Sequence, residues 1–95
     1  MFTSPRYATR GVTTTVPLML QIVLWDLIDS MKVESKDYLQ VFRLTTDGKT
    51  QCITHTQEQP PYERTLEFSS SEPITAKIFV IDDGTHTTML LAEEY

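Results

Sequence analysis

The residues best suited to chemistry gather in one stretch near the end of the chain. Asp82, Asp83 and His86 are close together in the sequence, and carboxylates beside an imidazole can bind a metal ion or transfer protons. Asp83 is followed by Gly84, however, and Asp-Gly is typical of a tight turn, in which Asp tolerates unusual dihedral angles. A small metal-dependent enzyme around these three residues is therefore an alternative and not the main prediction.

Cys52 and His55 form the other potentially reactive pair, and their spacing separates them. They are three residues apart in a stretch that alternates like a strand, so their side chains point to opposite faces of a sheet. They cannot share a metal ion or act as nucleophile and base. We expect Cys52 to be a small core side chain and His55 to be a polar cross-strand neighbour of Gln40.

The familiar catalytic and ligand-binding motifs are missing from the sequence. It contains no glycine-rich phosphate loop, no paired CxxC, no HExxH and no GxSxG. With only two histidines and one cysteine, it predicts no catalytic residue, no ordinary metal site and no cofactor.

The charge of the chain is negative and unevenly distributed. Residues 1–16 hold Arg6 and Arg10 and no acid, which leaves six basic and thirteen acidic side chains in the remainder, a balance of −7 within a total of −5. Phosphate binding needs clustered Lys and Arg, so direct nucleic-acid binding is not expected. The acidity instead fits a soluble protein, or one with a basic partner.

Three features predict a cytoplasmic protein that does not contact membranes. The single cysteine fits a reducing compartment. The first residues have no apolar core behind their charges, unlike a signal peptide. The most apolar stretch, "VPLMLQIVLWDLI", is interrupted by Gln21 and Asp26 and is too short to span a bilayer.

One helix is predicted from about residue 16 to residue 32. The threonines at 13–15 offer N-cap hydroxyls and Pro17 suits the first helical turn. One stripe at helical spacing is apolar and consists of Leu20, Leu24, Leu27, Ile28 and Met31. Further apolar residues widen this sector beyond what one sheet covers: Leu18, Met19, Ile22, Val23 and Trp25. We therefore expect a loop or another subunit to enclose the first half of the helix.

The remaining chain alternates like strands, and residues 6–12 could add a short one. Asp47-Gly48 and Asp83-Gly84 each predict a hairpin with a two-residue turn. The pairs that follow from these turns are Phe42 with Ile53, Gln40 with His55, Val80 with Thr87 and Ile78 with Met89. The predicted fold is α+β and forms a single domain over residues 1–95: one main N-terminal helix packed on a mostly antiparallel sheet of about five strands.

The last hairpin is apolar on both faces. Phe79, Ile81 and Leu90 occupy the face opposite to the predicted core, and one helix can cover only one side of a sheet. Either the N-terminal segment or another chain must cover the second side, because monomers usually avoid such patches. Together with Trp25, these residues form the candidate partner surface.

Four segments resemble a known family. "RYATRGV", "LWDLID", "DYLQVFRL" and above all "KIFVIDDG…MLLAEEY" are similar to an uncharacterised family of small proteins from low-GC Gram-positive bacteria and their mobile elements, the domain of unknown function number 960. The resemblance covers nearly the whole chain. It implies a cytoplasmic bacterial protein associated with mobile DNA, and it transfers no catalytic residue.

The sequence thus predicts a small cytoplasmic, non-enzymatic protein–protein interaction or regulatory module. Its expected partner is another protein or a second copy of itself in a homodimer. An acidic decoy that inhibits a nucleic-acid-binding protein is one alternative, motivated by the charge balance, and the small metal-dependent enzyme is a second.

Overall fold

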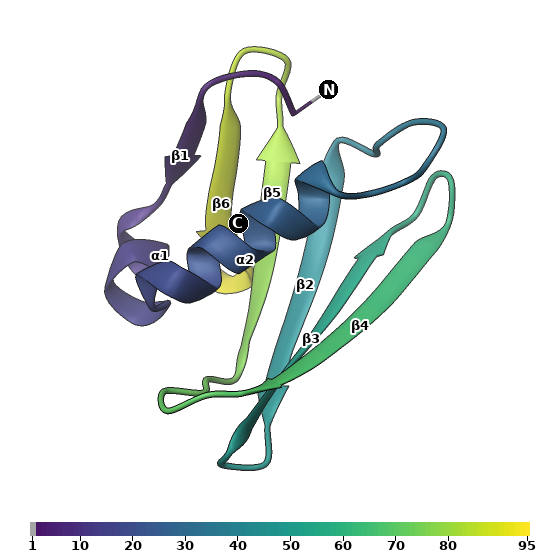
Figure 1. Ribbon diagram of the computed structural model, residues 1–95. Coiled ribbons are helices and arrows are strands. Elements are labelled where there is room, and N and C mark those ends of the chain that lie inside the picture. The colour runs from purple at the N-terminus through teal and green to yellow at the C-terminus, as the bar shows by residue number, and fades with distance from the viewer. Residues whose placement is uncertain (1) are drawn as a thin grey trace.

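A six-stranded sheet with helices on one face forms the fold, as the α+β prediction requires (Figure 1). The computed structural model describes residues 2–95. In chain order, the elements are β1 (Arg6–Ala8), α1 (Arg10–Thr15), α2 (Leu18–Asp29), β2 (Leu39–Thr46), β3 (Thr50–Gln57), β4 (Tyr62–Ser69), β5 (Ala76–Asp82), β6 (Thr87–Leu91) and a final 3₁₀ turn, Ala92–Glu94.

The strand order is β1-β6-β5-β2-β3-β4. Neighbours are antiparallel except β1 and β6, which pair in parallel with Arg6 opposite Thr87. The segment at residues 6–12 therefore supplies a strand as well as the start of a helix. Because the partners of β1 lie some 80 residues away, no local pattern could assign this pairing.

Two helices replace the single one predicted. The side chain of Thr9, not the later threonines, caps α1 by accepting the backbone N–H of Val12, and the threonines at 13–15 lie inside that helix. Val16 is extended because the residue before a proline disfavours helical dihedral angles. Pro17 then stands at the N-cap of α2, so the helix begins two residues later than predicted.

The predicted apolar stripe of α2 is confirmed as the core. Leu20, Leu24, Leu27 and Ile28 are buried, as is Met31 just beyond the helix. They pack on the inner face of the sheet, whose buried apolar side chains are Phe42, Leu44, Ile53, Ile78, Val80, Met89 and Leu91. In residues 2–95, no helix is long and apolar enough to cross a bilayer.

Both hairpins lie where the sequence predicts them, but the predicted register of each was wrong. The β2–β3 ladder pairs Phe42 with His55, and the β5–β6 ladder pairs Val80 with Met89. Each pairing is displaced by two residues from the prediction, because the turn has four residues instead of two. A shift of two keeps every side chain on its predicted face.

An aspartate side chain builds each of these turns. Oδ1 of Asp47 accepts the backbone N–H groups of the two residues after Gly48 at 3.0 and 2.9 Å. Oδ1 of Asp83 does the same for those after Gly84 at 2.9 and 2.7 Å. Both glycines have positive φ, 103° and 97°, which few other residues adopt readily.

The two ends of the chain lie against the sheet in different ways. Phe2 is buried in the core on the helix side, and its backbone N–H donates to Oδ2 of Asp82 at 2.5 Å. The ring of Tyr95 stands edge-on against Phe79, with 5.7 Å between ring centroids. The N-terminal segment therefore does not cover the second face of the sheet, and the C-terminal residues shield part of it.

Candidate interaction surfaces

The carboxylates near the last turn are engaged in structural hydrogen bonds. Asp82 is buried, and its oxygens accept the backbone N–H groups of Phe2 and Gly84. Asp83 builds the turn, and the backbone N–H groups of His86 and Thr85 lower the pKa of its carboxyl. In residues 2–95, no group of three His, Cys, Asp or Glu side chains is arranged to hold a metal ion. This geometry gives the metal-dependent enzyme no positive support.

Cys52 and His55 lie on opposite faces of β3, as predicted. Cys52 is half-buried on the outer face, so its assignment to the core was wrong. His55 is fully buried and lies opposite Phe42, not opposite Gln40 as predicted, but its Nε2 still lies 2.7 Å from Oε1 of Gln40 as a diagonal neighbour. Burial, with a smaller contribution from the charge of Arg64, lowers the pKa of His55 to about 4. His55 is therefore a neutral core residue at pH 7.

The outer face of the sheet carries the apolar residues that the sequence singled out. Val41, Phe79 and Leu90 lie side by side across β2, β5 and β6. Phe79 and Ile81 are half-buried, but only 9% of Leu90 is exposed. Since Tyr95 and the neighbouring strands already shield part of this patch, it offers less apolar surface than the sequence implied.

Two cations lie beside this outer patch. Arg43 of β2 and Lys77 of β5 are directly opposite each other, and both are exposed. Within residues 2–95, the one ion pair joins Arg6 and Asp29, so neither cation has a carboxylate partner. Like charges opposite one another weaken a sheet, which makes this pair a local cost to stability.

The exposed face of α2 is the larger apolar surface. Leu18, Met19 and Ile22 are 69%, 70% and 50% exposed, and in the described part of the chain no loop encloses them. Trp25 is half-buried on the next turn, under the guanidinium of Arg6 at 4.8 Å from the ring centroid. Of the excess apolar residues predicted for this helix, Leu18, Met19 and Ile22 are therefore left open to solvent, whereas Val23 and Trp25 pack partly against the core.

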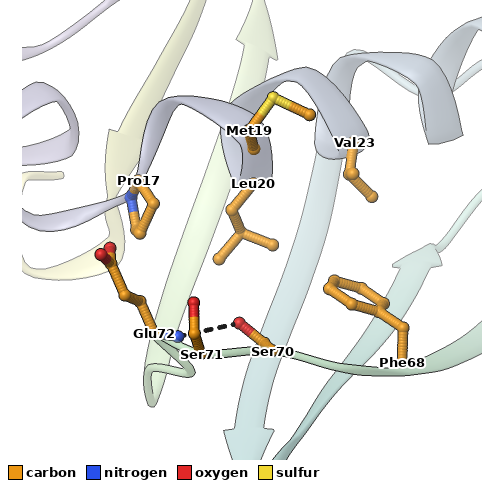
Figure 2. A pocket seen from close by; sticks show the side chains of 8 residues that line it. All are labelled: Pro17, Met19, Leu20, Val23, Phe68, Ser70, Ser71 and Glu72. Atoms are coloured by element: carbon orange, nitrogen blue, oxygen red, sulfur yellow. Dashed lines mark hydrogen bonds between the residues drawn. The ribbon is translucent and has the colours of Figure 1, made fainter.

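A groove of about 380 Å³ lies beside this face, between α2 and the connection from β4 to β5. Figure 2 shows Leu20 and Val23 pointing from α2 into the groove, with Phe68 across from Val23 and Glu72 near Pro17. The complete lining is Pro17, Met19, Leu20, Val23, Phe68, Ser70, Ser71 and Glu72.

The side chain of Gln51 holds the far wall of the groove in place. Its Oε1 accepts the backbone N–H of Ile74 at 2.8 Å, and its Nε2 donates to the carbonyl of Ile74 at 3.0 Å. Gln51 is buried on β3, so it links the β4–β5 connection to the sheet. The sequence analysis missed this groove because its walls lie some 50 residues apart in the chain.

Comparison with known proteins gives two similarities. A family model described as "Staphylococcal protein of unknown function (DUF960)" matches residues 5–94. The crystal structure of a protein of unknown function from Enterococcus faecalis is similar at 32% sequence identity and a TM-score of 0.81, over 97% of this chain and 91% of that chain. No curated protein matches the chain.

Proposed function

The chain belongs to the staphylococcal proteins of unknown function (DUF960), and we propose that it is a non-enzymatic protein–protein interaction module. One observation carries this proposal: Leu18, Met19 and Ile22 expose large apolar side chains on one face of α2 beside an apolar groove. Contiguous apolar surface of this kind marks contact sites, and burying it gains about 25 cal/mol for each Å² removed from water.

The cellular setting is also part of the proposal. A cytoplasmic location fits the single free cysteine, Cys52. A regulatory role on mobile genetic elements follows from the family resemblance of the sequence. The outer patch of Phe79, Ile81 and Leu90 is a second candidate contact surface, with less exposed apolar area than α2.

The acidic-decoy alternative draws less support from the positions of the acids. A decoy needs free carboxylates gathered on one surface. Asp82 is buried, Asp29 pairs with Arg6, and Asp47 caps a turn. The negative charge of the chain is therefore partly committed to its own structure.

Photo-crosslinking in the bacterium that encodes the protein tests the interaction module. A photoreactive phenylalanine analogue in place of Ile22 is expected to give a crosslinked protein species on irradiation. The same analogue in place of Thr65, which is exposed on β4 and away from both apolar surfaces, is the matched control. Absence of any crosslink from position 22, or equal crosslinks from both positions, would overturn the proposal.

A further inference from the structure

The exposed face of α2 is symmetric about Ile22. Leu18 and Met19 precede it by four and three residues, and Trp25 and Asp26 follow it by three and four. Residues at these spacings share one face of a helix, and Leu18, Met19, Ile22 and Asp26 are exposed while Trp25 is half-buried. We name these five residues the α2 stripe.

We propose that the α2 stripe binds the α2 stripe of a second copy of this chain, antiparallel, about a two-fold axis through Ile22. This inference rests on the proposed function and names its partner. A C₂ interface places one patch against itself, so that residue i meets j and j meets i. The symmetric spacing then sets Ile22 against its own counterpart, Leu18 against Trp25, and Met19 against Asp26.

The apolar contacts are complementary in this arrangement. Met19 lies on the groove side of the α2 stripe and lines the groove. The two-fold axis leaves each flank of the α2 stripe on its own side of the interface, so Trp25 of the second copy lies on the flank away from the groove, next to Leu18. An indole ring against a leucine side chain buries a large apolar area, and the two-fold axis repeats this contact on the other half of the interface.

The charges also favour the antiparallel orientation. No side chain caps the start of α2, and its first turn holds no acid. The backbone N–H groups of Leu18 and Met19 have no acceptor within residues 2–95. An antiparallel copy brings the carboxylate of its Asp26 to this positive end of the helix dipole, whereas a parallel copy would set Asp26 against Asp26.

A helix of a different protein is the competing occupant of this surface. It would form an interface without two-fold symmetry. Such a partner needs no match between the two halves of the α2 stripe. The self-match of apolar residues around Ile22, with an acid aligned on an uncapped helix end, favours a second copy.

Cysteine pairing in the full-length chain tests both the dimer and its orientation, in a Cys52→Ser background. Under mild oxidation, the Ile22→Cys variant is expected to form disulfide-linked dimers at least tenfold faster than Leu18→Cys alone. Two Leu18 positions would lie about 12 Å apart along the axis of an antiparallel pair, beyond the Cα separation that a disulfide allows. A mixture of Met19→Cys and Asp26→Cys chains is expected to link the two variants to each other.

Light scattering of the unmodified chain completes the test and is expected to report a dimer. Ile22→Glu places two carboxylates together on the axis and is expected to weaken dimerisation roughly a hundredfold. Rapid linking of Leu18→Cys to itself would contradict the antiparallel orientation. A monomer, with Ile22→Cys linking no faster than the control Thr65→Cys, would overturn the proposal. A crosslink from position 22 to a different protein in the cell would then leave the interaction module intact with another partner.

Discussion

Nε2 of His55 lies 2.7 Å from Oε1 of Gln40 inside the core, while Nδ1 of the same ring has no hydrogen-bond partner in the described part of the chain. Nε2 therefore carries the proton and donates it to the amide oxygen. A second proton on the ring would have to sit on Nδ1, buried and without an acceptor, which is costly.

This arrangement predicts a stability that depends on pH. The pKa of His55 is about 4 in the folded state and about 6.5 in an unfolded chain. Because the unfolded state binds more protons between these values, the free energy of unfolding is expected to fall by about 3 kcal/mol as the pH falls from 6.5 to 4. Urea denaturation at a series of pH values measures this loss.

Two variants show whether His55 causes this pH dependence of the free energy of unfolding. Replacing exposed His86 by Gln should leave the pH dependence in place, whereas His55→Gln should remove it. The lowered pKa values of Asp29, Asp47 and Asp83 add a separate loss at lower pH, since their stabilisation disappears as those carboxylates take up protons. A flat free energy of unfolding between pH 6.5 and 4.5 would contradict the role given to His55.

Gln51 is expected to matter for the groove as well as for the core. Gln51→Leu leaves the backbone N–H of Ile74 without its partner, at a cost of about 1–3 kcal/mol in the free energy of unfolding. The β4–β5 connection should also become more accessible to proteases. Gln59→Leu, at an exposed position, is the control, and equal effects of the two substitutions would show that Gln51 is not the anchor.

The opposed cations on the outer face predict a stabilising substitution. Arg43→Glu replaces a repulsion across β2 and β5 with an attraction to Lys77, and should raise the free energy of unfolding by about 0.5 kcal/mol at low salt. Arg43→Gln removes only the repulsion and should gain less. Both gains should vanish in 1 M NaCl, where exposed charges are screened; a loss of stability in Arg43→Glu would contradict this reading.

The two faces of α2 should respond in opposite ways to substitution. Leu24→Ala removes a fully buried side chain and is expected to cost about 2–5 kcal/mol. Ile22→Gln changes a half-exposed one, and in dilute protein it should alter the free energy of unfolding by less than about 0.5 kcal/mol. Thermal denaturation at low concentration compares them, and a large loss in Ile22→Gln would place this residue in the core.

The sequence predicts the faces of the elements better than their pairing. The buried residues of α2 follow from helical spacing. The strand residues lie on their predicted faces of the sheet, although the predicted registers of both hairpins were wrong. Successive side chains of a strand alternate between the two faces of the sheet, so an error of two residues in register changes the neighbours of a side chain and not its face. The four-residue turns escaped prediction because Asp47 and Asp83 form them with their side chains, and the Asp-Gly pattern does not reveal this.

The candidate surface was predictable in part. The excess of apolar residues around Ile22 is visible in the sequence, and the exposure of Leu18 and Met19 agrees with it. The groove was not visible, since Phe68 reaches α2 only through the three-dimensional path of the β4–β5 connection. The shielding of Leu90 likewise depends on tertiary packing.

Isotope-filtered nuclear Overhauser spectroscopy tests the central claim, that the exposed face of α2 is covered by the same face of a second copy. In an equal mixture of labelled and unlabelled chains, the methyl groups of Leu18 in one copy should show cross-relaxation with the Trp25 ring of the other. These residues lie about 10 Å apart along the axis of α2, so a contact within one chain is not expected. Absence of this intermolecular signal at millimolar concentration, with the Ile22 methyl contacting only water, would contradict the account.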